Sequence, residues 1–166
     1  KAGSYTAHPL VSAPATVKLV QKAHGLDEDA AVLYLQTLAL PNPTQKAVCA
    51  WNDWTAARYK KAAEALTKVA GLVVSGKRER AAREIFLPGA WIKIDGLPCE
   101  AWKEGLFGDD KQVNEPAGAL FARAWARATG GDPPRFEETR KKAPKAGAAP
   151  VEEAAPAKAK GKGKTK

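Results

Sequence analysis

Methionine is absent from the 166 residues, cysteine occurs only twice, and no apolar run is long enough to cross a membrane. Cys49 and Cys99 lack the spacing of metal ligands, so we expect two reduced thiols and no metal site. A charged-then-apolar leader is also missing, which favours a cytoplasmic chain without a membrane partner. The chain begins with Lys1 and has no methionine. We therefore expect either a processed protein or a piece of a longer one, and we favour the piece.

Motifs that carry chemistry are equally scarce. The stretch "SGKRE" at 75–79 lacks the Ser or Thr that follows the lysine of a phosphate-binding loop, because Arg78 stands at that position. His8 and His24 have no cysteine or carboxylate at ligand spacing, and no Ser-His-Asp or Cys-His arrangement is visible. We therefore expect a protein that is not an enzyme and uses no cofactor.

Positive charge is what the sequence has in excess. It holds 27 Lys and Arg against 18 Asp and Glu, a net charge of +9, which favours a polyanionic partner such as nucleic acid. Residues 137–166 carry nine basic and four acidic side chains in an Ala, Pro, Gly and Lys-rich segment, so we predict a disordered basic tail. The tail suits a nonspecific clamp on a polyanion, a solubilising end or an address signal, and we favour the clamp.

The rest of the chain predicts an arm at 1–11 and one domain at 12–136 with its core at 27–94. Ser12, Asp27, Thr44 and Thr55 are candidate N-caps of successive helices. The helix after Asp27 has two apolar stripes, so we expect it to be the core helix. A last helix is expected from Glu115 to Gly130, with Leu120, Phe121, Ala124 and Trp125 on its buried side.

After Gly71 the pattern becomes β-like. Residues 72–74 and 85–87 are β-prone runs around a basic polar tip, which predicts a hairpin with a long loop, and "WIKI" at 91–94 predicts another strand. The expected fold class is therefore mainly α with a small antiparallel β-hairpin or sheet, an α+β fold.

From about 27 to 94 the predicted elements occur in a set order. A helix is followed by a short helix, a tight turn at Asn52-Asp53, a longer helix and a basic hairpin. This order resembles the winged helix-turn-helix superfamily in its transcription-regulator form. The resemblance implies that "TQKAVCAW" is the positioning helix, that 55–70 is the recognition helix and that 71–88 is the wing. The two tryptophans beside the turn, Trp51 and Trp54, depart from the smaller residues of many members, and we expect both to pack.

Charge placement agrees with this resemblance. Residues 55–83 hold eight basic and two acidic side chains, a net charge of +6, whereas the rest of 1–136 holds ten basic and twelve acidic ones. The predicted nucleic-acid-binding residues are the eight basic ones, Arg58, Lys60, Lys61, Lys68, Lys77, Arg78, Arg80 and Arg83. On the long helix Tyr59, Ala63, Leu66 and Ala70 form the predicted buried stripe, while Arg58, Lys61, Ala65 and Lys68 line the predicted groove face.

Two functions follow from these patterns. The first is a DNA-binding module whose helix 55–70 enters the major groove while the wing at 75–83 and the lysine tail contact phosphates, with base readout by Arg58 or Lys61. Such a protein would be associated with the nucleoid. The alternative is a winged-helix module that docks another protein or the rest of a longer chain, which the aromatic stretches at 96–108 and 118–131 favour if they are exposed.

Overall fold

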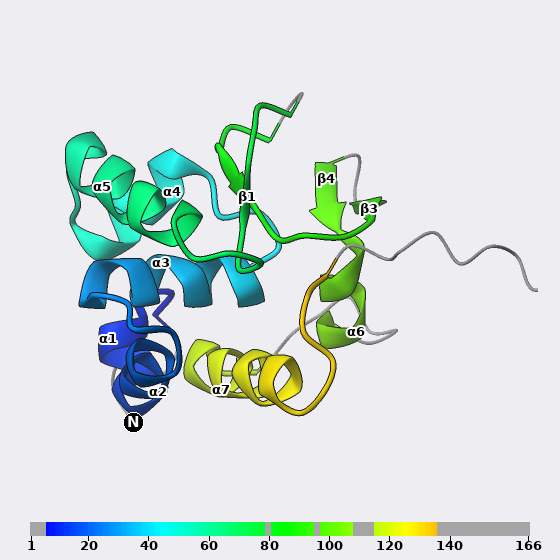
Figure 1. The fold of residues 1–166 in the computed structure, drawn as a ribbon, viewed down its shortest axis with the longest axis horizontal. Coiled ribbons are helices and arrows are strands. Elements are labelled where there is room, and N and C mark those ends of the chain that lie inside the picture. Colours follow the sequence, from blue (N-terminus) through cyan, green and yellow to red (C-terminus); the bar gives the residue numbers. More distant parts are fainter. Residues whose placement is uncertain (1–5, 79–80, 95–96, 108–114, 136–166) are drawn as a thin grey trace, which may run out of the picture.

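The computed structural model describes residues 6–78, 81–94, 97–107 and 115–135. It is mainly helical with two small antiparallel strand pairs, which confirms the α+β class (Figure 1). The elements in chain order are α1 (Pro9–Ser12), α2 (Pro14–His24), α3 (Glu28–Ala39), α4 (Gln45–Asn52), α5 (Ala56–Thr67), β1 (Val74–Ser75), β2 (Ile85–Phe86), β3 (Trp91–Ile94), β4 (Leu97–Glu100), the 3₁₀ turn η1 (Ala101–Lys103), α6 (Glu104–Phe107) and α7 (Ala117–Thr129).

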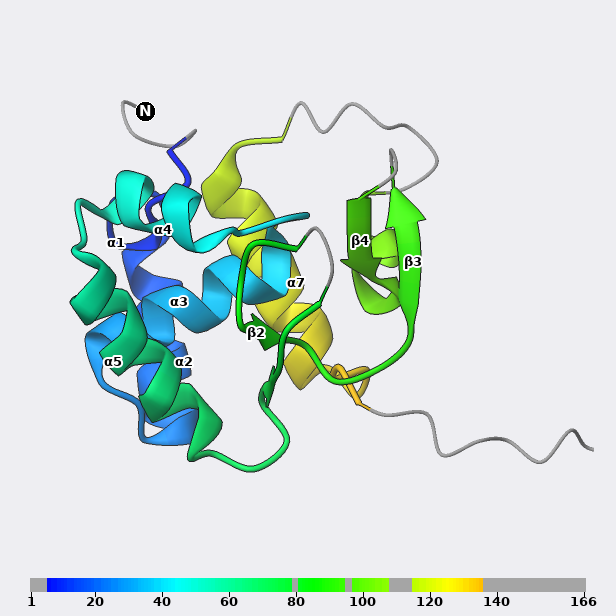
Figure 2. The ribbon, with the colours of Figure 1, turned by 90° about the horizontal axis from the view of Figure 1, so that it is seen from above.

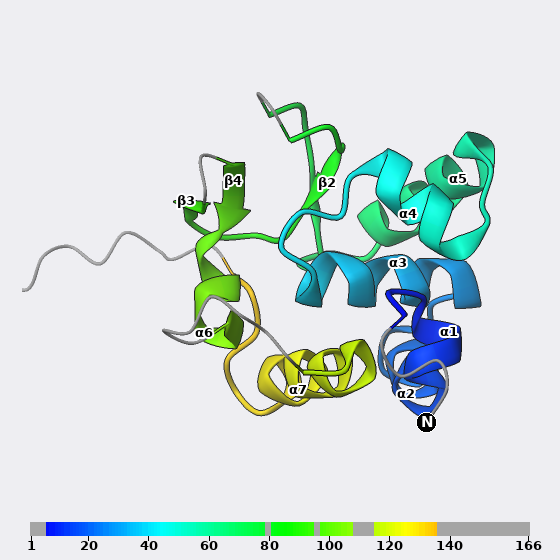
Figure 3. The same ribbon diagram turned by 180° about the vertical axis from the view of Figure 1, so that it is seen from behind.

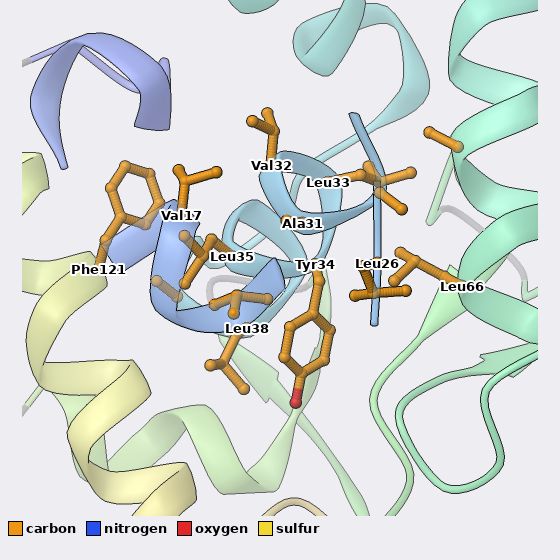
Figure 4. Close-up of a cluster of buried hydrophobic side chains, with 14 of the residues drawn as sticks. Val17, Leu26, Ala31, Val32, Leu33, Tyr34, Leu35, Leu38, Leu66 and Phe121 are labelled. Carbon is orange, nitrogen blue, oxygen red and sulfur yellow. The ribbon is translucent and has the colours of Figure 1, made fainter. Parts of the chain in front are cut away.

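Helix α3 is the centre of the fold, as its two apolar stripes predict. Ten of its twelve residues are buried, because α5 packs on one side and α2 and α7 pack on the other (Figure 1). Leu33 and Leu66 meet on the α5 side, while Leu35 lies towards Val17 and Phe121 (Figure 4). Burial of these large side chains is the main source of stability, at about 1.5–3 kcal/mol for each.

Three of the four predicted N-caps are confirmed. The side chains of Asp27, Thr44 and Thr55 accept hydrogen bonds from the amides three residues later, at 2.8, 3.2 and 3.2 Å. The prediction for Ser12 was wrong, because Ser12 already ends α1 and its hydroxyl donates to the carbonyl of His8. Helix α2 begins instead with Pro14 at its first position, where the missing amide costs nothing.

The turn between α4 and α5 is tight. Asp53 has a φ of 54°, a left-handed conformation that a short polar side chain tolerates. Trp54 is 7% exposed and its amide donates to the carbonyl of Cys49, so the predicted packing of this tryptophan is confirmed. Trp51, in contrast, is 36% exposed at the end of α4.

The strands form two separate pairs. In the β1–β2 hairpin Val74 pairs with Phe86 and Ser75 with Ile85, so this hairpin is shorter than the predicted runs at 72–74 and 85–87. The predicted strand at 91–94 is confirmed as β3, but its antiparallel partner β4 was not predicted. The β1–β2 hairpin lies between α5 and the β3–β4 pair in each of the three ribbon views (Figures 1, 2 and 3).

The C-terminal aromatics fold back onto the domain. The predicted last helix is confirmed as α7, and its four predicted apolar residues are all buried. The indole nitrogen of Trp102 donates to the carbonyl of Asp132 at 2.8 Å, and the guanidinium of Arg127 lies 4.5 Å from the Trp102 ring centroid. Trp102 and Phe107 nevertheless remain partly exposed, so the aromatic stretches that the docking alternative uses are covered only in part.

The predicted arm at 1–11 and the predicted tail at 137–166 both include residues that the structure does not describe. Within the predicted arm at 1–11, α1 begins at Pro9 and Pro9 is buried, so residues 9–11 belong to the folded part. The predicted tail at 137–166 lies outside the description. In the part of the chain that is described, no helix has the length and apolar character needed to cross a membrane.

Candidate nucleic-acid interface

Helix α5 presents one face to the core and the opposite face to the surroundings. Its buried residues are Tyr59, Ala62 and Leu66. The predicted stripe is therefore corrected at two positions: Ala63 is only partly buried, and Ala70 is exposed beyond the helix end at Thr67. At 100° per residue, the face opposite the buried residues carries Lys61, Glu64 and Lys68, with Lys60 beside them towards the hairpin.

Five of the eight predicted binding residues are exposed on α5, at its end or on the hairpin. They are Lys60, Lys61, Lys68, Lys77 and Arg78. None of the five makes a salt bridge to a carboxylate of the described residues. Unpaired surface cations attract phosphates, since no internal partner has to be displaced before a phosphate binds.

Arg58 is exposed but engaged. Its Nε and Nη2 atoms donate to the two carboxylate oxygens of Asp29 at 2.8 and 2.7 Å, and its guanidinium lies 5.1 Å from the ring centroid of Trp54. Two hydrogen bonds to one carboxylate hold an arginine guanidinium in a fixed plane. The guanidinium therefore lies against the start of α3, and guanine readout by Arg58 would require this pair to open.

Arg83 lies in the interior, so its assignment to the binding surface is corrected. The side chain is fully buried, and its two terminal nitrogens donate to Glu100 at 2.9 Å each. Lys103 completes the cluster, with its Nζ atom 3.0 Å from Glu100 and 2.6 Å from the carbonyl of Leu40. We call Arg83, Glu100 and Lys103 the buried ionic cluster. Arg80, the eighth predicted residue, lies outside the described residues.

The electrostatics of the buried ionic cluster explain why its charges persist. Burial opposes ionisation of Glu100, but the ammonium of Lys103 and the guanidinium of Arg83 outweigh burial and keep the pKa of Glu100 below its usual value. Burial lowers the pKa of Lys103 to about 8, although the Glu100 carboxylate opposes this change. The cluster joins the end of α3 to β2, β4 and η1, and its role is to hold these parts together.

The hairpin residue Arg78 is oriented by aromatic rings. Its guanidinium lies 4.2 Å from the ring centroid of Trp91 and 5.3 Å from that of Phe86. Phe86 also contacts the buried guanidinium of Arg83, at 4.8 Å. A cation above an aromatic face keeps its charge available while losing freedom of movement. The rings therefore present Arg78 at the surface in a restricted position.

One candidate was missed by the sequence interpretation. Lys46 is exposed in the first turn of α4, and the adjacent Gln45 amide donates to the carbonyl of Ala82 at 3.1 Å, which ties this turn to the hairpin. The predicted basic segment began at residue 55 and therefore left Lys46 out. No periodic pattern in the sequence places Lys46 beside the hairpin. We call Lys46, Lys60, Lys61, Lys68, Lys77 and Arg78 the basic surface.

Two carboxylates accompany the basic surface. Glu64 on α5 and Glu84 next to β2 line an open groove of about 480 Å³ between the helix and the hairpin. With the six cations of the basic surface, they leave a net charge of +4. Among the described residues no three His, Cys, Asp or Glu side chains gather as a metal site would require, and both cysteines are free.

Comparisons with known proteins add no further assignment. No family model matches this chain, and no significant similarity was found to curated proteins or to solved structures.

Proposed function

We propose that this protein is a non-catalytic module that binds double-stranded DNA. In this proposal α5 enters the major groove, and the hairpin and the lysine-rich tail contact phosphates. The observation that carries the proposal is the basic surface, in which Lys60, Lys61, Lys68, Lys77 and Arg78 are exposed without a carboxylate partner in the described structure. Neutralisation of phosphates by such side chains is the main source of affinity for DNA.

The order of elements supports a winged helix-turn-helix arrangement. Helix α3 would be its first helix, α4 and α5 its helix-turn-helix with Asp53 in the turn, and the β1–β2 hairpin its wing. In this superfamily the second helix of the pair lies in the major groove. The separate β3–β4 pair is an addition to that arrangement.

The proposed contacts are assigned from the position of each side chain. Lys61 and Lys68 lie on the outward face of α5 and would enter the groove, so Lys61 is the best candidate for base readout. Lys46, Lys77 and Arg78 would contact phosphates beside it. Arg58 and Arg83 serve intramolecular contacts to Asp29 and Glu100 instead.

The docking alternative keeps only part of its support, because Phe121 and Trp125 are buried while Trp102 and Phe107 are partly exposed. Trp102 and Trp125 are held by contacts within the domain, and Trp125 is only 8% exposed. The exposed cations of the basic surface favour DNA binding, which is the function that we put forward.

Fluorescence anisotropy of a labelled DNA duplex tests the proposal, with the full chain and a truncated chain that ends at Thr139 measured across a salt series. The truncated chain is expected to bind and to lose affinity steeply between about 50 and 200 mM salt, because about 0.9 counterion is released per neutralised phosphate. Binding by the full chain alone would assign the affinity to the tail and reject α5 and the hairpin as the interface.

A further inference from the structure

Helix α5 carries a carboxylate on the face that is proposed to meet DNA. Four exposed residues recur there at spacings of four, three and four, which places them within about 60° of one another on the side away from the core. We call these residues the outer line. They are Ala57, Lys61, Glu64 and Lys68.

Glu64 has lysines at three of the four positions where a helix usually forms ion pairs. Lys60 and Lys61 precede it by four and three residues, and Lys68 follows it by four. In the described part of the chain, however, Glu64 forms no salt bridge. The Thr67 hydroxyl donates to the backbone carbonyl of Glu64 at 2.9 Å and not to its carboxylate. The carboxylate is therefore available to a donor outside the protein.

A carboxylate in this place has a cost and a use. It repels the phosphates of every sequence alike, because it carries the same sign of charge. Base edges in the major groove differ, since cytosine presents the N4 amino group as a donor, whereas guanine and thymine present acceptors to a carboxylate. Adenine presents a donor at N6, but its N7 acceptor lies beside that donor. Glu64 therefore loses least affinity where it faces a cytosine.

The spacing of the outer line fits neighbouring base pairs. Lys61 and Glu64 are three residues apart, or about 4.5 Å along the helix axis, which is close to the rise of about 3.4 Å per base pair. Lysine in the groove pairs with the O6 and N7 acceptors of guanine. The two side chains can thus face two adjacent base pairs with opposite requirements.

We infer that Glu64 determines the sequence specificity of this interface by selecting a cytosine next to the guanine that Lys61 contacts. The inference rests on the DNA binding proposed above and names the class of duplex that is bound, one with guanine and cytosine in adjacent base pairs. Lys60, Lys68 and the hairpin cations supply the affinity that Glu64 takes away.

The test is selection by the full chain from a library of DNA duplexes with a randomised centre, read by sequencing. Wild type is expected to enrich cytosine at one position by about tenfold over each other base, with guanine favoured beside it. Glu64→Gln should change the preferred base at that position from cytosine to adenine, because a glutamine amide accepts from N6 and donates to N7 of adenine. Glu64→Ala should lose the preference and gain no other.

The matched control is Glu84→Gln, which removes the same charge beside the basic surface but from the hairpin. It should strengthen binding to all sequences and leave the preferred base unchanged. An unchanged base preference in Glu64→Gln, or a gain in affinity that is equal for all sequences as in the control, would overturn the role of Glu64 while DNA binding stands. Absence of binding by the truncated chain would instead reject the proposed function, and this inference with it.

Discussion

Arg78 and Arg83 are five positions apart in one basic run, yet the structure uses them in opposite ways. Arg78 lies on the surface against Trp91, with no carboxylate partner among the described residues, whereas Arg83 is buried and bound through two nitrogens to Glu100. The same contrast separates the whole basic surface from the buried ionic cluster. Removing a charge from the cluster should therefore change stability, and removing one from the basic surface should change binding.

The largest effect is expected from Glu100→Gln. This change leaves Arg83 and Lys103 buried without their counter-charge, so the free energy of unfolding should fall by about 3–5 kcal/mol. Urea denaturation measures the loss. Glu104→Gln, four residues further on and exposed, should leave the midpoint nearly unchanged. A loss for Glu100→Gln as small as that of the control would show that the cluster contributes little.

The second effect concerns alkaline pH. The pKa of Lys103 is about 8 in the folded chain, below its ordinary value of 10.5, so the unfolded chain binds more protons between these values. Lys103 alone therefore makes stability rise with pH across this window, because the cost of its buried charge is present below pH 8 and is relieved above it.

Denaturation of wild type and Lys103→Met at several pH values isolates this contribution. Burial raises the pKa of both cysteines and of Tyr34 and Tyr59, so these groups lower the stability of both proteins above about pH 9. The stability of wild type relative to Lys103→Met should rise from pH 8 upwards. A constant difference across the window would contradict the lowered pKa of Lys103.

A smaller effect, on binding alone, is expected on the basic surface. Lys61→Gln with Lys68→Gln should weaken DNA binding and reduce the slope of log affinity against log salt by about 2, since each lysine neutralises about one phosphate. The control is the double variant Lys18→Gln with Lys22→Gln on α2. It removes the same amount of charge from the other side of α3 (Figure 1). Equal slopes for the two double variants would reject α5 as the interface.

The smallest effect is expected for Arg58→Gln, which the sequence interpretation placed at the centre of the interface. Because Arg58 is held by Asp29, its loss should change the salt slope of DNA binding less than the loss of Lys61 does. The same anisotropy series compares the two single variants. A larger change for Arg58→Gln would show that the Asp29 pair opens on DNA and would restore the predicted groove face.

Local patterns in the sequence predicted most helices and failed where distant residues decide the structure. The caps at Asp27, Thr44 and Thr55 act within three residues, and the buried stripes of α3 and α7 follow the helical period. The burial of Arg83 depends on Glu100, 17 residues later, and the engagement of Arg58 depends on Asp29, 29 residues earlier. No spacing rule reports such partners, because they meet only after the elements have packed.

The most direct test of the central claim is acetylation of lysines in the full chain, with and without duplex DNA, read by mass spectrometry. DNA is expected to protect Lys60, Lys61, Lys68 and Lys77, while Lys18 and Lys22 on α2 should react equally in both states. Lys103 serves as an internal reference, because it is fully buried and should react slowly throughout. Protection of the α2 lysines, or none on α5 and the hairpin, would contradict the assignment of DNA binding to the basic surface.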